Sequence, residues 1–353
     1  MNETSNKIRL CFQTTIAPNK NKTEIDSIKL RAVFTKNNLW PAYKNITVGF
    51  IGDGENTRLE KGLSLNEDPL NIELMNLLTQ NPRKITIKDS IKRIVKERIE
   101  PIVNLKFIFV ENPSNALVQI SFKNDGSYAD LGYDQNYITT VNFAWFNVDV
   151  VLHEFGHLLG MYHEHQSPYE NPVSWDKEAV YKIMAAEGNW SKETTDRNIL
   201  DNLDKASING STFDPLSIMQ YYYPPEFTTN KVGSGVNARF SGKDVLWICK
   251  TYPKQNEDPR VTAENFYQRV YGESLQSSID RSEQMAAKLR DPIIATFPPT
   301  TFPPVTPVPP APTVPPVPIK SNSTIWIVFG IVFGLIIIFG VIALFINNKN
   351  SIK

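Results

Sequence analysis

All four histidines of this 353-residue chain lie in one short stretch, HEFGHLLGMYHEH, at residues 153–165. His153 and His157 are four residues apart, so on a helix their side chains project from the same face, one turn apart. Two imidazoles at this spacing can bind one tetrahedral metal ion. Glu154 lies one step round the helix from His153, where its carboxylate can accept a hydrogen bond from a water at the ion without binding the ion itself.

His163 can reach the same ion only if the helix ends before it. On a continuous helix it would lie about 15 Å along the axis from His153. Gly160 tolerates a positive φ and stands just past the last expected turn, so the chain can swing back there. The spacing therefore predicts a metal site of three histidines, with a fourth position left open for catalysis. His165 is expected to be a surface group or a support for the ligands, because a fourth imidazole would fill the open position.

An amphipathic helix with surface histidines is the competing interpretation of this stretch. A pair of histidines with one glutamate arises by chance often enough to be only suggestive. The glycine and the third histidine at matching spacing argue against chance, and the metal site is preferred.

Composition narrows the possible partners. Lys and Arg together number 37, as do Asp and Glu, so the net charge of the chain is +0. Such a balance gives no electrostatic case for binding nucleic acid, and we expect no nucleic-acid partner. Cys11 and Cys249 are the two cysteines. They allow at most one disulfide, and their scarcity suits a reducing compartment.

The C-terminal part of the sequence reads as a spacer followed by a membrane anchor. Residues 292–318 are rich in proline and carry no charge, which favours a semi-rigid polyproline II spacer. A ligand for SH3 or WW domains is the alternative, but little basic sequence flanks the segment. The uncharged apolar run 325–346 would span roughly 33 Å as a helix, enough to cross a bilayer. We therefore expect a single-pass membrane protein.

The side of the membrane is a separate expectation. The N-terminal sequence lacks an apolar stretch long enough for a signal peptide, and only seven residues follow the apolar run. This layout resembles that of a tail-anchored protein, with the large domain facing the cytosol on an intracellular or virion membrane. Lys349 and Lys353 argue weakly for the opposite orientation. With the domain in the cytosol, the glycosylation motifs at Asn45 and Asn189 would remain unused.

Several elements can be expected between residues 39 and 253. β-Branched and aromatic residues predict strands at 45–52, 104–111 and 116–122. Helical periodicity of apolar residues predicts helices at 87–103 and 146–160, the second capped by Asn147 or Asp149. The sequence after the histidines is rich in turn residues, and a closing helix is expected at 241–253.

The motifs resemble those of a known protease family. HEFGHLLGMYH is similar to the extended zinc signature of the metzincins, and the His-Glu pair at 163–164 resembles the astacin family in particular. SIMQYY at 217–222 resembles the astacin methionine turn, with Met219 as its methionine. Tyr221 matches the tyrosine that in astacins can swing between the metal and the bound reaction intermediate, whereas Tyr222 and Tyr223 lack that spacing. The wider sequence resembles bacterial, fungal and large-DNA-virus members.

Some positions depart from the family pattern. Typical astacins carry two disulfides, which this chain cannot form, and an Arg-rich stretch after the third histidine. In those enzymes the counterpart of Glu164 contacts a freed N-terminus, a role that is in doubt here because no propeptide boundary is evident. Residues 50–53, FIGD, resemble a propeptide motif whose aspartate blocks the zinc. They also end a strand pattern, and the strand is the preferred interpretation.

The resemblance implies an α+β fold of metzincin type, with a twisted mixed sheet, an active-site helix and an irregular C-terminal subdomain. It implies a metalloendopeptidase that holds one Zn²⁺ per chain through His153, His157 and His163. In it, water activated by the zinc attacks a protein or peptide substrate, with Glu154 as general base and Tyr221 assisting. The alternative is a catalytically inert, metal-stabilised adhesion or recognition module on a membrane, against which Glu154 argues. Hydrolysis of a non-peptide amide is a third option.

The expected parts of the chain are an N-terminal extension (1–38), the protease domain (39–255), a helical stalk or linker (256–291), the Pro-rich spacer (292–320), the transmembrane helix (325–346) and a short tail (347–353).

Overall fold

The computed structural model describes residues 11–14, 34–60, 67–80, 85–188 and 190–290. Most of the N-terminal extension lies outside these ranges. The predicted Pro-rich spacer, transmembrane helix and tail also lie outside them. Among the described residues, no helix is both long and apolar enough to cross a membrane.

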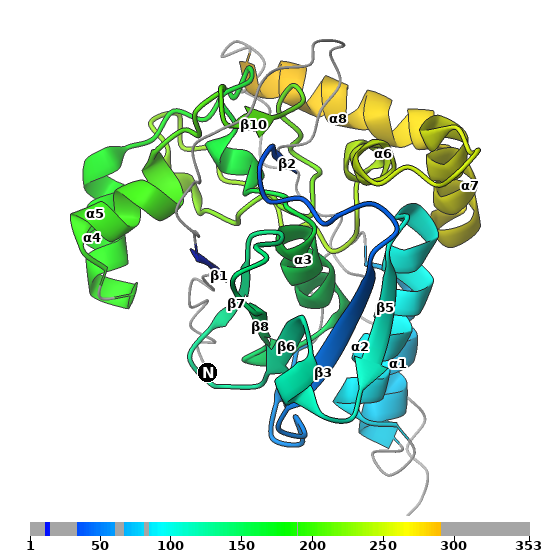
Figure 1. The fold of residues 1–353 in the computed structure, drawn as a ribbon. Coiled ribbons are helices and arrows are strands. Elements are labelled where there is room, and N and C mark those ends of the chain that lie inside the picture. Colours follow the sequence, from blue (N-terminus) through cyan, green and yellow to red (C-terminus); the bar gives the residue numbers. More distant parts are fainter. Residues whose placement is uncertain (1–10, 15–33, 61–66, 81–84, 189, 291–353) are drawn as a thin grey trace, which may run out of the picture. The chain divides into compact units, whose positions relative to one another are not determined.

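A six-stranded mixed sheet forms the framework (Figure 1), with the strand order β1-β7-β8-β6-β3-β5. Neighbouring strands run parallel except for the antiparallel pair β7 and β8. Three of the strands match the predicted ones, and the sheet agrees with the mixed sheet expected of an α+β fold. The six strands are β1 (Cys11–Thr14), β3 (Asn45–Ile51), β5 (Lys106–Val110), β6 (Val118–Ser121), β7 (Ser127–Asp130) and β8 (Thr139–Asn142).

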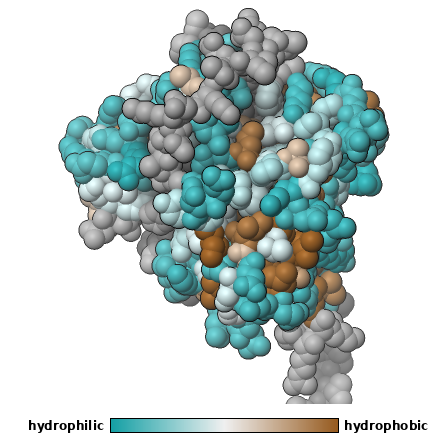
Figure 2. Space-filling model, in the orientation of Figure 1, coloured by the Kyte–Doolittle hydropathy of each residue, from teal (hydrophilic) through white to brown (hydrophobic). Residues whose placement is uncertain are grey.

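Strand β3 shows why this sequence forms a central strand. Ile46 and Val48 alternate with less buried residues and are fully buried, as expected for a strand with one face on the core. Phe50 and Ile51 end the strand, so the first two residues of FIGD belong to a strand of the sheet, and Gly52 and Asp53 follow it. In the space-filling view, hydrophobic surface on this face gathers over β3 and β5 (Figure 2), where Ile51 and Ile108 are exposed.

Two short strand pairs complete the described sheets. β2 (Phe34–Thr35) pairs antiparallel with β10 (Ile208–Asn209). β4 (Arg58–Leu59) pairs parallel with β9 (Trp145–Phe146), which leads directly into the histidine helix. These pairs tie segments that are distant in sequence to the region around the histidines.

The helix predicted at 87–103 is present, but it changes from α-helical to π-helical and then to 3₁₀ geometry along its length. After α1 (Pro69–Gln80), the chain forms α2 (Ile87–Ile94), a π-helical turn η1 (Val95–Ile99) and a 3₁₀ turn η2 (Glu100–Ile102). Thr86 caps α2 in a capping box with Asp89. Pro101 lacks an amide hydrogen, so a regular α-helix cannot continue through it. The predicted apolar face is buried along the whole segment: Ile87, Ile91, Ile94, Val95 and Ile99.

The second predicted helix is α3 (Val148–Leu158). Of the two candidate caps, Asn147 is the residue whose side chain precedes the helix and accepts from the amide of Val150. The helix packs beside β7, and apolar residues such as Val151 and Phe155 are completely buried. Because α3 lies inside the core, its buried polar side chains, such as Glu154 and His157, are held by the residues packed around them.

The region after the histidines is irregular, as expected, and contains short elements. These are η4 (Glu164–Gln166), α4 (Lys177–Gly188), α5 (Lys192–Thr195), the π-helical turn η5 (Asp196–Leu200) and η6 (Pro225–Phe227). A small apolar cluster that includes Val180, Met184 and Phe227 joins α4, η5 and η6. A further 3₁₀ turn, η3 (Pro113–Asn115), precedes β6. The predicted closing helix is α6 (Gly242–Thr251).

The described part of the predicted stalk, residues 256–290, differs from the expectation in its packing. It is helical, as α7 (Pro259–Tyr271) and α8 (Leu275–Arg290), but both helices pack against α6 (Figure 1). Phe266, Tyr267 and Leu275 are buried in the same core as the sheet. Most residues of this segment are polar, so its few apolar positions did not indicate a packed helix. These apolar positions pack α7 and α8 against the rest of the domain.

Candidate metal centre

Helix α3 presents His153 and His157 with their ring tautomers fixed. His153 Nδ1 lies 2.8 Å from the carbonyl oxygen of Ile218, and His157 Nδ1 lies 2.8 Å from that of Met161. A carbonyl can only accept, so each Nδ1 carries the hydrogen and each Nε2 keeps its lone pair. Such backbone partners are typical of metal-binding histidines, because they orient the ring and set its tautomer.

Gly160 turns the chain back toward α3, as predicted. Its φ is +95°, a conformation that other residues rarely adopt. Its amide donates to the carbonyl of His157 at 2.8 Å. A side chain at Gly160 would also meet Thr35 and Leu39. Both the backbone angle and the close packing therefore require glycine at this turn.

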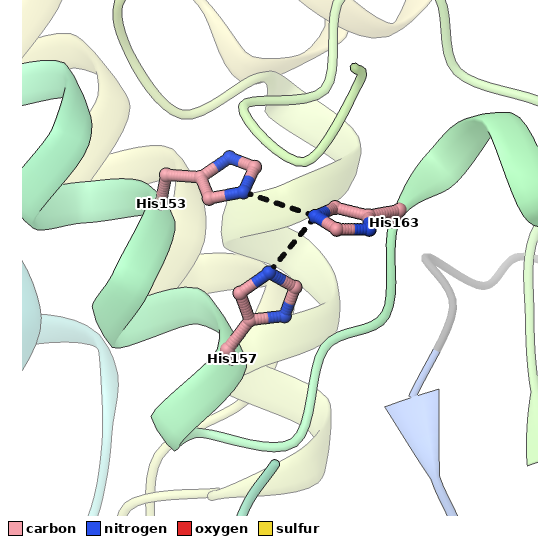
Figure 3. Close-up of side chains that lie close together, drawn as sticks. All are labelled: His153, His157 and His163. Carbon is pink, nitrogen blue, oxygen red and sulfur yellow. Dashed lines mark hydrogen bonds between the residues drawn. The ribbon is translucent and has the colours of Figure 1, made fainter. Parts of the chain in front are cut away.

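The turn brings His163 to the other two histidines (Figure 3). Its Nε2 lies 3.3 Å from Nε2 of His153 and 3.1 Å from Nε2 of His157. Ligands of tetrahedral zinc at 2.0–2.1 Å stand about 3.3 Å from one another. One ring hydrogen on His163 cannot serve two facing lone pairs well, whereas a cation among the three nitrogens satisfies all of them. The donor set and its spacing fit one zinc ion.

Burial keeps these imidazoles neutral. It lowers the pKa of His153 to about 4 and holds the pKa values of His157 and His163 well below the ordinary value. The cause is the loss of hydration, which disfavours the charged ring. Because a lowered pKa postpones protonation to more acid conditions, all three nitrogens are available to a metal at neutral pH.

The carboxylic acid of the motif is shielded from solvent. Glu154 follows His153 on α3 and is 0% exposed. It does not belong to the group of ring nitrogens that converge. This placement agrees with a carboxylate that lies beside a metal ion without binding it.

The methionine turn lies against the histidine helix. Met219 is fully buried, and its sulfur occupies the space that a side chain at Gly156 of α3 would need. The carbonyl of Met219 accepts from the amide of Glu164 at 3.0 Å. The turn therefore supports both the helix and the segment that carries His163.

Of the three consecutive tyrosines, Tyr221 is the one placed at the histidines. Its ring centroid lies 5.2 Å from that of His163 and 5.0 Å from that of His165. Tyr222 is exposed. Tyr223 packs on Trp175, with 4.8 Å between the ring centroids.

His165 is a buried support and not a surface residue. It is 0% exposed, its Nε2 lies 3.0 Å from the carbonyl oxygen of Asn198, and its ring stacks on that of His163. The sequence allowed either a surface group or a support for the ligands, because no nearby residue indicates the contact between His165 and Asn198.

A buried polar network beneath the methionine turn was not predicted. Asp244 accepts from the hydroxyl of Ser217 at 2.7 Å and from the amide of Ile218 at 2.8 Å. It thereby fixes the residue whose carbonyl orients His153. The pattern Ser241-x-x-Asp244, a capping box at the start of α6, was the available sequence signal. Burial raises the pKa of Asp244 to about 7.

Glu164 belongs to the same network. Its Oε1 accepts from the amide of Asp214 at 2.9 Å. Burial, reinforced by the negative charge of Asp214, raises the pKa of Glu164 well above its ordinary value. In this chain the glutamate after His163 therefore joins the third ligand to the loop before the methionine turn.

The sequence around the three histidines matches a known protein family. Residues 81–242 match the family model described as Astacin, a family of peptidases. Two solved structures of myroilysin are similar to the chain, at 28% and 26% identity. The match to the first has a TM-score of 0.48 and covers 63% of this chain and 99% of the myroilysin chain. The match to the second has a TM-score of 0.39 and covers 70% of this chain and 93% of the myroilysin chain.

A third similar structure is high choriolytic enzyme 1, a hatching enzyme zinc-protease from Oryzias latipes (Medaka fish), at 14% identity and a TM-score of 0.37. It covers 62% of this chain and 95% of its own. None of the curated proteins matches the chain. The three histidines and the methionine turn lie within the residues that match the Astacin family model, and the three ring nitrogens are placed to hold one zinc ion.

Proposed function

We propose that the domain is a zinc-dependent endopeptidase that hydrolyses internal peptide bonds, with Glu154 as general base. The observation that carries the proposal is the convergence of three neutral imidazole nitrogens beside a buried carboxylate that is not one of the ligands. A structural metal site is closed by its ligands and has no use for such a carboxylate. The inert recognition module is therefore the weaker alternative.

The chain's own residues supply the following steps. When bound, zinc polarises the scissile carbonyl and lowers the pKa of water to about 7. Glu154 takes a proton from the attacking water and returns it to the leaving amine. Tyr221, beside His163, donates a hydrogen bond to the oxygen on which negative charge develops. The carbonyls of Ile218 and Met161 keep the ligand rings oriented throughout.

A peptide library tests the proposed reaction. Peptides blocked at both ends are incubated with the full chain, and the products are identified by mass spectrometry. The proposal expects cleavage at internal bonds, which a blocked end does not prevent. Zinc-loaded protein that cleaves none of the peptides would favour the inert module, or an enzyme that hydrolyses another amide.

Tyr221→Phe is expected to lower kcat about tenfold or more, with a smaller change in KM. A hydroxyl that acts mainly in the transition state affects turnover more than substrate binding. Tyr222→Phe is the matched control, because that side chain is exposed and should leave both constants nearly unchanged. The reverse outcome would show that the tyrosine of the methionine turn has been assigned one residue too early.

We also propose that residues 325–346 anchor the domain to a membrane, with the domain on the cytosolic side. The support is the length of the uncharged apolar run together with the free, buried thiol of Cys249, which suits a reducing compartment. The full chain should resist alkaline extraction from membranes of its native host cell, and a variant without 325–346 should not. Loss of sugar from Asn45 or Asn189 on glycosidase treatment would place the domain in the lumen and contradict the orientation.

A further inference from the structure

Helix α8 carries buried hydroxyl groups on the face that packs into the domain. Ser278 and Ser282 are one turn apart and are 1% and 0% exposed. A serine inside a helix usually bonds to a carbonyl of its own preceding turn. Here the hydroxyl of Ser282 instead donates to Oδ1 of Asp214 at 2.6 Å. This bond joins α8 to the loop that precedes the methionine turn.

Asp214 connects that bond to the metal centre. Its carboxylate is fully buried and also accepts from the hydroxyl of Ser241 at 2.6 Å and the amide of Leu216 at 3.0 Å. Its own amide donates to Oε1 of Glu164 at 2.9 Å. Glu164 directly follows the ligand His163. Two hydrogen bonds, joined through Asp214, therefore connect α8 to the residue beside the third ligand.

A second contact holds the same loop to α8. Glu283 lies 2.6 Å from the ammonium group of Lys243 and accepts from the hydroxyl of Thr212 at 3.2 Å. Lys243 also donates to the Thr212 hydroxyl, at 3.1 Å. Residues 212 and 214 are thus both fixed by neighbouring residues of one helix turn. A buried carboxylate that loses a donor is costly, so Asp214 should move if the Ser282 hydroxyl is removed.

We infer that Ser282 is a positioning residue of the metal centre, which acts through Asp214 and Glu164 on the ligand His163. Helix α8 lies beyond the segment 81–242 that matches the family model, so the family match does not account for this role. The inference rests on the proposed function for its effect on turnover, but its effect on zinc binding does not depend on the reaction.

The experiment compares Ser282→Ala with Ser278→Ala in the full chain. Ser278 is the matched control, because its hydroxyl is equally buried but bonds to the amide of Gly242 and the hydroxyl of Tyr267 and not to Asp214. Zinc affinity is measured by competition with a chelator, and thermal unfolding is followed with and without zinc. Both variants should unfold at lower temperature than the wild type when zinc is absent.

Zinc binding should separate the two variants. Groups that directly support a ligand contribute about 10–100-fold to metal affinity. Two hydrogen bonds separate Ser282 from Glu164, so Ser282→Ala should weaken zinc binding less, about three- to tenfold. Ser278→Ala should change it less than about twofold, and Ser282→Thr should restore most of the loss. With a cleavable peptide, Ser282→Ala should lower kcat and leave KM nearly unchanged, because Ser282 does not touch substrate.

Equal zinc affinities in Ser282→Ala and Ser278→Ala would overturn the inference and leave α8 a purely structural helix. If Ser282→Ala does not fold, Ser282→Cys makes the same comparison, because a thiol is only a weak donor. If the wild type binds zinc but cleaves no peptide, the proposed function fails, and the zinc affinities still decide the role of Ser282.

Discussion

Glu154→Gln should retain one zinc per chain and lose about 10²- to 10⁴-fold in kcat, the usual contribution of a general acid–base group. The amide has nearly the size of the carboxylate, so the buried site keeps its packing. The glutamine amide, however, cannot accept the proton of the attacking water. Because the three ring nitrogens that converge come from other residues, metal binding should be close to that of the wild type.

Asp149→Asn is the control for this substitution. It makes the same chemical change in the first turn of the same helix, away from the converging nitrogens. Its turnover should stay close to that of the wild type. A Glu154→Gln protein with full zinc occupancy and more than about a tenth of the wild-type turnover would remove Glu154 from the proposed mechanism.

His163→Ala should lower zinc affinity more than about 100-fold, because even residues that only support a ligand contribute about 10–100-fold. The substitution removes one of three converging nitrogens and the ring that packs against Tyr221 and His165. Zinc raises the unfolding temperature of a protein that binds it only when folded. That increase should be large in the wild type and nearly absent in the variant.

His165→Ala separates loss of a ligand from loss of packing. His165 is an imidazole as buried as His163 but is not among the converging nitrogens. The variant should be less stable than the wild type and still bind zinc. If His165→Ala loses zinc as severely as His163→Ala, the ligand assignment is wrong.

The local part of the site could be predicted from the sequence. The spacing of His153 and His157 follows from the period of a helix, and the return of the chain to His163 depends on one glycine, whose φ of +95° is a local property. The buried faces of α2 and β3 were predictable for the same reason, because both follow a short periodic pattern of apolar residues.

The supporting part of the site depends on contacts between distant segments. The carbonyl of Ile218 orients His153, which lies 65 residues earlier in the chain, and Ser282 bonds to Asp214 across 68 residues. A carbonyl group has no sequence signature, and a serine in a polar helix does not reveal its partner. The packing of α7 and α8 was not predicted for the same reason: their apolar positions are few, and only the core of the domain shows where they belong.

The central claim is that one zinc, held by the three histidines, supports peptide hydrolysis by this chain. The direct measurement is a zinc titration of the metal-free full chain, with cleavage of a peptide at an internal bond followed at each step. Cleavage should be absent without metal, rise in proportion to added zinc and level off at about one equivalent per chain, as expected for a single catalytic site with three protein ligands. Cleavage that persists in the metal-free chain, or that does not return with zinc, would contradict the account.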